Sequence, residues 1–385
     1  GLHVILSWDT AECFAFVGNN HRFPFATSSS AIKSRKRSNG LGFASSDDAL
    51  SDFGLPDGLR DTLITNARDA FQKRIWIVDN SGSMKMWDGH LVLNRETDCT
   101  RWDELKETIG CHAQLSATLG APSDFRLLNK PSNGQDSFRV GYGRRIRRDS
   151  KRALAIMAKS QPSGMTPLHT RIQEVRREVI RMLPQLLRDG SKVALIVCTD
   201  GCNFDTEAGT SWLAPEERNQ EFLQALESLQ GLPVHVVIRL CTDFGPIIDF
   251  YNGLDERLNL RLDVLDDHIA EALEVNQHNK WLNYALVLHR MREMGQSNPL
   301  FDLLDERPFT KDEIREFIGL LFGPQKLPDP SICDWAAFCQ EVEKLQKAER
   351  MHWNPLTKEL SPWIDVDELE LADCIDVDDF VEESL

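Results

Sequence analysis

The chain has 385 residues and a formal net charge of −16, from 44 Lys and Arg against 60 Asp and Glu. Hydrophobic residues make up 41% and charged residues 27%, which is ordinary for a globular protein. An acidic chain repels phosphate, so its charge argues against nucleic-acid binding. The densest apolar run, residues 193–198, has the length of a strand, and no segment reaches the roughly 20 apolar residues of a membrane-spanning helix.

Cysteine usage favours a reducing compartment. The nine cysteines are scattered without a repeating framework, there is no Asn-x-Ser/Thr sequon, and residues 1–8 lack the basic leader of a signal peptide. We therefore expect an intracellular protein, in the cytoplasm. A nuclear location is the alternative, because residues 33–37 are rich in Lys and Arg.

Composition and the spacing of apolar residues divide the chain into four parts. Residues 1–54 are polar and predict a poorly ordered segment. In residues 55–265 short apolar runs alternate with helical spacing, whereas residues 266–363 predict a helical extension with a short hairpin at 353–363. Residues 364–385 predict a mobile acidic tail, since positions 365–385 hold ten Asp and Glu and no Lys or Arg.

The middle part predicts an α/β fold. Six strands are expected, at 74–78, 125–128, 138–142, 192–198, 233–240 and 260–265, with helices at 101–115, 166–187 and 216–229 between them. Strands that are apolar on both faces and separated by helices indicate a doubly wound, mainly parallel sheet of the Rossmann-like kind. Ligands of such sheets bind beyond the carboxyl ends of the strands.

One motif follows the first expected strand directly. Asp79, Ser81 and Ser83 alternate with Asn80 and Gly82, and the glycine allows the tight bend that brings one carboxylate and two hydroxyls together. Hard oxygen donors in a small shell suit Mg²⁺. The motif therefore predicts a magnesium site, with Mn²⁺ or Ca²⁺ as alternatives.

The motif resembles that of the von Willebrand factor A (VWA) domain, whose metal-ion-dependent adhesion site begins with Asp-x-Ser-x-Ser. Two further loops match the family in the right order: residues 163–168 (Ser-Gly-Met-Thr-Pro-Leu) and residues 198–201 (Cys-Thr-Asp-Gly). The resemblance covers residues 72–265. The chain as a whole is similar to intracellular eukaryotic VWA-domain proteins. The resemblance implies that Ser81, Ser83 and Thr166 ligate the ion, while Asp79 and Asp200 hold its coordinated waters.

Simpler interpretations of the same residues remain open at this point. Asp79 to Ser83 is also compatible with a plain turn in which a serine caps the following helix. Thr166 before Pro167 is compatible with an ordinary helix N-cap, and Thr199 to Gly201 with a simple turn. Cys198-Thr-Asp recurs as Cys241-Thr-Asp, so Asp243 is expected at the same edge of the sheet, either in an acidic rim or as a plain strand-end residue.

The resemblance implies a protein-interaction module in which the ion binds an acidic side chain of a protein partner. An enzyme is not indicated, because the chain has no P-loop, no His-Glu-x-x-His and no Gly-x-Ser-x-Gly. One alternative is a metal-assisted hydrolase that acts on a phosphorylated substrate. The other is a scaffold that binds through its helical extension and keeps only a vestigial metal site.

Overall fold

The computed structural model describes residues 50, 54–92, 96–132, 134–143, 145–201, 220–254, 257–296, 298–329 and 333–372. These residues all belong to one compact unit, which comprises residues 44–385. The expected polar segment 1–54 lies almost wholly outside the described residues. Among the residues that are described, no helix is both long enough and apolar enough to cross a bilayer.

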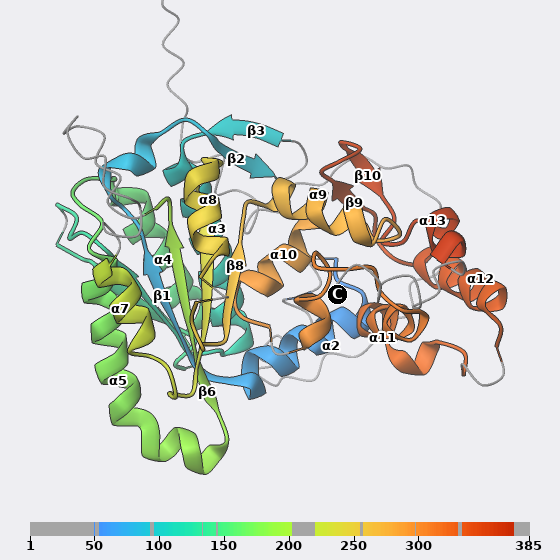
Figure 1. Ribbon diagram of the computed structural model, residues 1–385, viewed down its shortest axis with the longest axis horizontal. Helices are drawn as coiled ribbons and strands as arrows, with labels where there is room; N and C mark the ends of the chain where they lie inside the picture. The colour runs from blue at the N-terminus through green and yellow to red at the C-terminus, as the bar shows by residue number, and fades with distance from the viewer. Residues whose placement is uncertain are drawn as a thin grey trace, which may run out of the picture. The chain divides into compact units, whose positions relative to one another are not determined.

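The centre of the unit is a six-stranded sheet (Figure 1). Its strands are β1 (Phe71–Val78), β4 (Ser123–Leu127), β5 (Ser137–Val140), β6 (Lys192–Thr199), β7 (Val234–Leu240) and β8 (Leu262–Leu265). All six expected strands are therefore confirmed. The order is β5-β4-β1-β6-β7-β8, and every pairing is parallel except that of β5 with β4.

The strand order places a ligand-binding crevice at a definite position. Numbered among themselves along the chain, the six strands follow the order 3-2-1-4-5-6, so the connections diverge between β1 and β6. Loops that leave two neighbouring strands in opposite directions open a crevice at their carboxyl ends. In this sheet the corresponding position is at Val78 and Thr199, where the motif loops begin.

Helices cover both faces of the sheet. They are α2 (Asp57–Thr65), α3 (Arg101–Leu119), α4 (Ile146–Lys159), α5 (Leu168–Asp189), α7 (Gln220–Glu227) and α8 (Gly245–Asn252). Alternate side chains of β1 face opposite cores: Ile75 and Ile77 join the core under α5, α7 and α8, and Trp76 and Val78 join the core under α3 and α4. The doubly wound α/β architecture is therefore confirmed.

The extension adds more helices, as expected from the sequence. These are α9 (His268–His278), α10 (Leu286–Glu293), α11 (Lys311–Phe322), α12 (Trp335–Gln346) and α13 (Val366–Leu371), with the hairpin β9 (His352–Asn354) and β10 (Glu359–Ser361). The α13 helix lies within the range expected to form the acidic tail, and its Leu369 is fully buried. An apolar residue at one helix face thus orders the start of an otherwise acidic segment.

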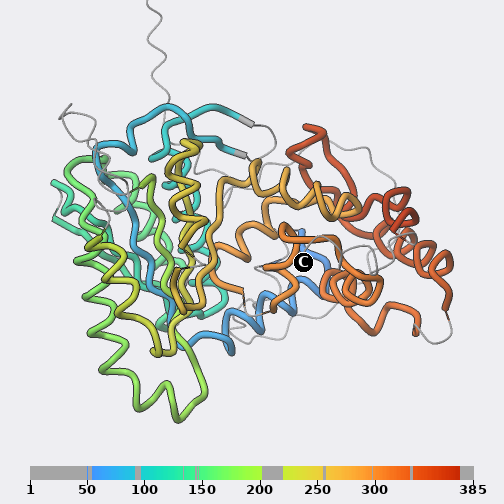
Figure 2. Tube along the Cα trace, in the orientation of Figure 1, coloured from blue at the N-terminus to red at the C-terminus, as the bar shows by residue number. Residues whose placement is uncertain are grey.

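Helices α8 and α13 were not expected from the sequence, and neither were two further features. The first is the small antiparallel pair β2 (Gly89–Val92) and β3 (Glu96–Cys99), which lies outside the main sheet. The second is α2, which precedes β1 but packs against α11 of the extension, so that chain segments far apart in sequence lie together (Figure 2). Both elements are short, and neither has the periodic apolar pattern on which the expectations were based.

The extension shares the core under α3 rather than forming one of its own. The buried residues of this core run from Trp76 in the sheet through Leu288 of α10 to Phe317 of α11 and Phe338 of α12. Arg74 of β1 reinforces the junction, because its fully buried guanidinium donates to the carbonyls of Met294, Ala67 and Asn66 at 2.9 to 3.0 Å.

A buried ionic network joins α10 to α3 and β7. Glu293 is fully buried and accepts from Arg290 at 2.8 Å, from His112 of α3 at 2.8 Å and from Arg239 of β7 at 3.3 Å. Burial alone would raise the pKa of Glu293, but Arg290, His289 and His112 hold that pKa well below its usual value. Arg239 also binds Glu104 of α3, so the charges alternate in sign across the junction.

We expect Glu293→Ala to lower the free energy of unfolding by about 3–5 kcal/mol, because it leaves two arginines buried without their shared partner. Urea denaturation at neutral pH measures the change. The matched control is Glu341→Ala on α12, whose ion pair with Lys344 is partly exposed and should be worth at most about 1 kcal/mol. Equal losses in the two variants would show that the network adds nothing to stability.

Candidate functional site

The candidate site lies at the crevice between β1 and β6. Asp79 follows the last residue of β1 directly, and Asp200 follows the last residue of β6. The amide of Asp79 donates to the carbonyl of Cys198 at 2.9 Å, so the two loops begin side by side. Both carboxylates therefore lie where the sheet topology opens a binding crevice.

Asp79 is fully buried and fixes the two loops to each other. One carboxylate oxygen accepts from the backbone amide of Ser81 at 2.8 Å, and the other accepts from the hydroxyl of Thr199 at 2.7 Å. These two donors are neutral. The carboxylate thus shapes the turn around Ser81 while its negative charge is left uncompensated by either contact.

The two serine hydroxyls and Asp200 form a short chain of oxygen atoms. The hydroxyls of Ser81 and Ser83 are 3.0 Å apart, and Ser83 donates to the carboxylate of Asp200 at 2.9 Å. Ser81 precedes the short 3₁₀ helix η4 (Gly82–Lys85) but makes no side-chain capping bond to it, so the plain capping interpretation of this serine is wrong. Ser83 is exposed, whereas Ser81 and Asp200 are buried, so the chain of oxygens reaches solvent at Ser83.

Backbone hydrogen bonds hold the Thr166 loop against the first loop. The amide of Gly82 donates to the carbonyl of Gly164 at 3.1 Å, and the amide of Ser163 donates to the carbonyl of Asn80 at 2.7 Å. Asn129, which follows β4, donates through its side chain to the carbonyl of Met165 at 2.7 Å. The three loops expected from the sequence therefore meet at one edge.

Thr166 itself is placed less closely than the other four residues. Helix α5 begins at Leu168 with Pro167 at its N-cap position, so the alternative in which Thr166 caps the helix is wrong. Within the described part of the chain, no hydrogen bond joins the Thr166 hydroxyl to Asp79, Ser81, Ser83 or Asp200. The structure thus brings those four residues together and leaves the half-buried Thr166 on the adjoining loop.

Arg101 is a residue of the site that the sequence did not indicate. It begins α3, and its guanidinium donates to Asp200 at 2.9 Å and binds both carboxylate oxygens of Asp88 at 2.6 Å. The long separation between Arg101 and Asp200 in the sequence hides this contact. The one local signal is the helix start at Thr100, whose side chain accepts from the amide of Asp103 at 3.1 Å.

The site has more negative than positive charge. Asp79, Asp88 and Asp200 would contribute three negative charges when ionised, against the single positive charge of Arg101. Burial and the nearby charge of Asp200 raise the pKa of Asp79 to about 7. Burial also raises the pKa of Asp200, although Arg101 and Ser83 oppose that rise. A divalent cation would balance this net charge of −2 and favour the ionised forms of Asp79 and Asp200.

Large apolar side chains project from the loops around these oxygens. Met86 and Trp87 follow η4 and are 56% and 69% exposed, Met165 directly precedes Thr166 and is 57% exposed, and Phe244 follows β7 and is 53% exposed. We call these four residues the apolar rim. Exposed aromatic and methionine side chains around a polar centre are typical of protein-binding surfaces.

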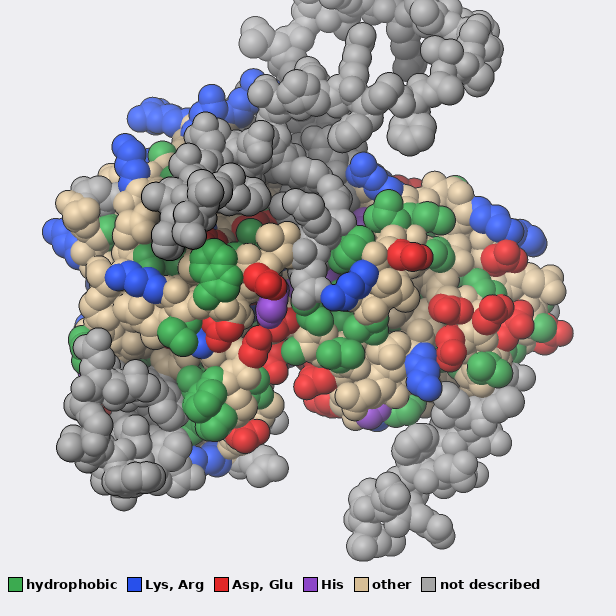
Figure 3. All heavy atoms as spheres, turned by 90° about the horizontal axis from the view of Figure 1, so that it is seen from above, with side chains coloured by type: hydrophobic (Ala, Val, Ile, Leu, Met, Phe, Trp, Pro, Cys, Tyr) green, Lys and Arg blue, Asp and Glu red, His purple; other side chains and the backbone are tan. Residues whose placement is uncertain are grey.

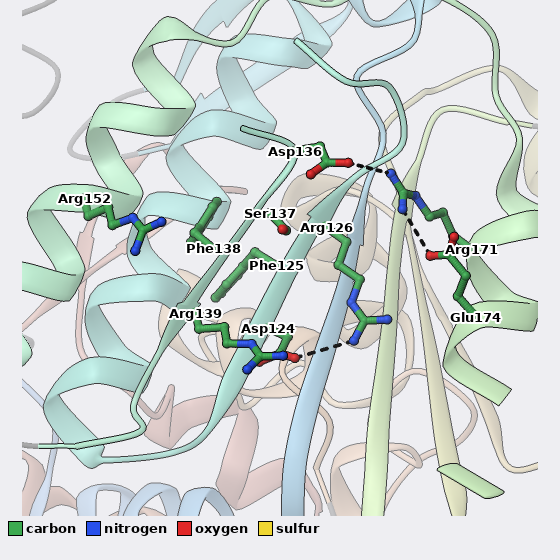
Figure 4. Close-up of a pocket in the computed structure, with 10 residues that line it drawn as sticks. All are labelled: Asp124, Phe125, Arg126, Asp136, Ser137, Phe138, Arg139, Arg152, Arg171 and Glu174. Atoms are coloured by element: carbon green, nitrogen blue, oxygen red, sulfur yellow. Dashed lines mark hydrogen bonds and ion pairs between the residues drawn. The ribbon is translucent and has the colours of Figure 1, made fainter. Parts of the chain in front are cut away.

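A separate cavity of about 460 Å³ lies beside β4 and β5 (Figure 4). Each of its three acidic side chains has an arginine partner: Arg126 points toward Asp124, and Arg171 points toward Asp136 and Glu174. None of the five residues expected from the sequence lines it. Because these charges compensate one another, the cavity offers no comparable set of open oxygen donors.

Comparison with known proteins gives little guidance. No protein-family model and no curated protein matches the chain. Among solved structures, a point mutant of the PilB minor pilin from Streptococcus sanguinis aligns with a TM-score of 0.34 and 13% identity. The alignment covers 51% of this chain and 57% of the pilin chain. This similarity is too low to assign a fold family or a function.

Gly164→Ala tests whether the loops fit together as described. Gly164 has φ +89°, and a Cβ there would lie 2.7 Å from the side-chain oxygen of Asn129. The control, Gly190→Ala, has φ +60° but no atom within 4 Å of its Cβ. We expect backbone strain of about 1–2 kcal/mol in both, with about 1 kcal/mol more in Gly164→Ala because Asn129 must move. Thermal or urea unfolding measures both, and equal losses would contradict this packing.

Proposed function

We propose that this chain is a protein-interaction module that holds Mg²⁺ at Asp79, Ser81, Ser83, Thr166 and Asp200, as in the VWA domains that it resembles. The observation that supports this most directly is the continuous chain of oxygens from Ser81 through Ser83 to Asp200, which reaches solvent at the exposed Ser83. Neutral hydroxyls would ligate the ion directly. Asp79, already fixed by Ser81 and Thr199, would hold a coordinated water rather than the ion.

The donor set fits a small hard cation. Hydroxyl and carboxylate oxygens suit Mg²⁺, which retains waters and uses few protein ligands, and Mn²⁺ or Ca²⁺ accept the same donors. With only neutral direct ligands, the ion would remain electrophilic toward an added carboxylate. Such an ion would bind an Asp or Glu side chain of a protein partner through a charge-assisted contact.

The apolar rim supports protein binding over hydrolysis. A partner that places a carboxylate on the ion would also cover Met86, Trp87, Met165 and Phe244, whose burial favours association. The hydrolase alternative requires a general base or nucleophile next to the substrate. In the described part of the chain, no histidine or cysteine makes a hydrogen bond to Ser81, Ser83 or Asp200.

Metal binding is tested by titrating Mg²⁺, Mn²⁺ and Ca²⁺ into wild type and Ser81→Ala/Ser83→Ala and measuring the heats. We expect the double variant to bind Mg²⁺ at least tenfold more weakly, which corresponds to about 1.4 kcal/mol. Ser163→Ala is the matched control, because only its backbone amide contacts the site loops. Equal Mg²⁺ affinity in wild type and the double variant would refute the assigned ligands.

The role of the apolar rim is tested on a partner isolated by Mg²⁺-dependent capture and chelator elution. We expect Trp87→Ala to weaken binding of that partner by about 10- to 100-fold, since exposed Trp residues are frequent hot spots, and to leave the Mg²⁺ affinity unchanged. The control is Leu187→Ala on α5, which is 68% exposed but lies outside the site loops. Capture that persists in chelator would instead favour the scaffold alternative.

A further inference from the structure

A second group of metal-binding side chains lies at the same edge of the sheet. His90 belongs to β2, Asp243 follows β7, and Asp267 follows β8 and occupies the N-cap position of α9. Asp243 is the residue expected at this edge from the repeated Cys-Thr-Asp sequence. On the face seen from above, acidic side chains gather around a histidine (Figure 3). None of these three residues has a role in the magnesium site.

The three side chains converge on a small volume. One ligand atom from each residue lies within 4.8 Å of the others, and Nε2 of His90 is 3.3 Å from Oδ2 of Asp243. The carboxyl groups of Asp243 and Asp267 lie next to each other in this group. His90 and Asp243 are 23% and 48% exposed, which leaves a path for an ion from solvent.

Backbone amides fix one of the three ligands, and a further carboxylate lies near the far ring nitrogen of His90. Oδ1 of Asp267 accepts from the amides of Ile269 and Ala270 at 2.6 and 3.0 Å, which leaves its other oxygen for the cluster. Nδ1 of His90 lies 3.9 Å from a carboxylate oxygen of Asp98. A carboxylate near the far ring nitrogen is the arrangement that orients a metal-binding histidine.

A buried histidine provides independent support. His268 is 4% exposed, and it lines a cavity of about 10 Å³ together with His90 and Asp267. Its Nε2 is 2.9 Å from the carbonyl of Tyr284, which can only accept, so Nε2 holds the ring proton. Its Nδ1 lone pair has no hydrogen-bond partner among the described residues. A cavity of this size holds about one water.

Nearby positive charges do not prevent a cation from binding here. Arg239 and Arg290 also line the small cavity. Arg239 binds Glu104 and Glu293, and Arg290 binds Glu107 and Glu293, so each guanidinium already has two carboxylate partners. A second acidic group among the described residues comprises Glu271, Glu274 and Asp305. It differs, because Arg292 binds both Glu271 and Asp305 and supplies the countercharge.

We propose that His90, Asp243 and Asp267 form a zinc site, separate from the magnesium site, with a water as the fourth ligand. Two ligand atoms that each lie 2.0–2.1 Å from a tetrahedral zinc ion are about 3.3–3.4 Å apart. The distance from Nε2 of His90 to Oδ2 of Asp243 is 3.3 Å. The water would occupy the small cavity and donate to Nδ1 of His268. One imidazole and two carboxylates suit Zn²⁺ better than Mg²⁺, which prefers oxygen ligands alone.

The test uses the full chain, stripped of metal and kept reduced, with excess Mg²⁺ present throughout. Calorimetric titration with ZnCl₂ should show one site in wild type. We expect His90→Gln and Asp243→Asn to bind Zn²⁺ at least tenfold more weakly, and Ser81→Ala/Ser83→Ala to bind it as wild type does. Glu274→Gln, in the second acidic group, is the control and should bind it unchanged. Asp267 is not substituted, because its side chain also caps α9.

Unchanged Zn²⁺ affinity in His90→Gln and Asp243→Asn, or no Zn²⁺ binding by wild type, would overturn the proposal. Far-UV circular dichroism shows whether each variant folds. X-ray absorption at the zinc edge of wild type needs no variant at all: one imidazole with oxygen ligands supports the site, whereas a sulfur shell overturns it. The result is independent of the magnesium proposal, since Ser81→Ala/Ser83→Ala separates the two.

Discussion

The arrangement of the candidate site depends on one unusual feature, a fully buried carboxylate that has no basic contact among the described residues. Glu293, Glu104 and Glu271 are also buried, and each of them contacts an arginine. Among the described residues, Asp79 contacts only neutral groups, namely an amide and hydroxyls of Ser81 and Thr199. Burying a charge costs several kcal/mol unless an opposite charge compensates it. Those three buried glutamates are thus paired with arginine, whereas Asp79 lies at the carboxyl ends of β1 and β6, where a cation would compensate it.

The buried charges also connect the extension to the edge that holds both candidate sites. Glu293 of α10 contacts Arg239 of β7, and Arg239 contacts Glu104 of α3. Glu104 in turn accepts from the backbone amide of His90 at 2.9 Å. The position of β2 is therefore fixed through α3 and β7 by the helix that completes the core. This explains physically why the extension shares the core of the sheet instead of folding as a separate body.

The sequence predicted the sheet well because its strands are apolar on both faces. Runs such as residues 192–198 have no other stable location than the centre of a covered sheet. The paired strands β2 and β3 contain His90, Glu96 and Asp98 and show no such run, so the pattern did not reveal them. The helices of the extension followed from their spacing. Their burial did not, because charged residues such as Arg290 and Glu293 normally indicate a solvated face.

The site was predictable only as far as its residues follow strands directly. Asp79 and Asp200 come at the ends of apolar runs, and parallel strands present their carboxyl ends at one edge, so their proximity follows from topology. The contact of Arg101 with Asp200 depends on where α3 begins relative to the β2–β3 pair, and no local sequence pattern specifies that position. The contact of His90 with Asp243 was not predictable either, because it depends on the path of β2 outside the main sheet.

The two groups of donors at this edge differ in a way that separates the ions they would select. Ser81, Ser83 and Asp200 offer oxygen alone, whereas His90 adds a borderline nitrogen to the carboxylates of Asp243 and Asp267. A site with an imidazole nitrogen suits zinc, whereas a site with oxygen ligands alone suits a hard ion such as magnesium. The pair of Arg101 and Asp88 adjoins both groups, because Arg101 contacts Asp200 and Asp88 lies two residues before His90. One edge of a single sheet can thus present a labile ion for a partner beside a more firmly held one.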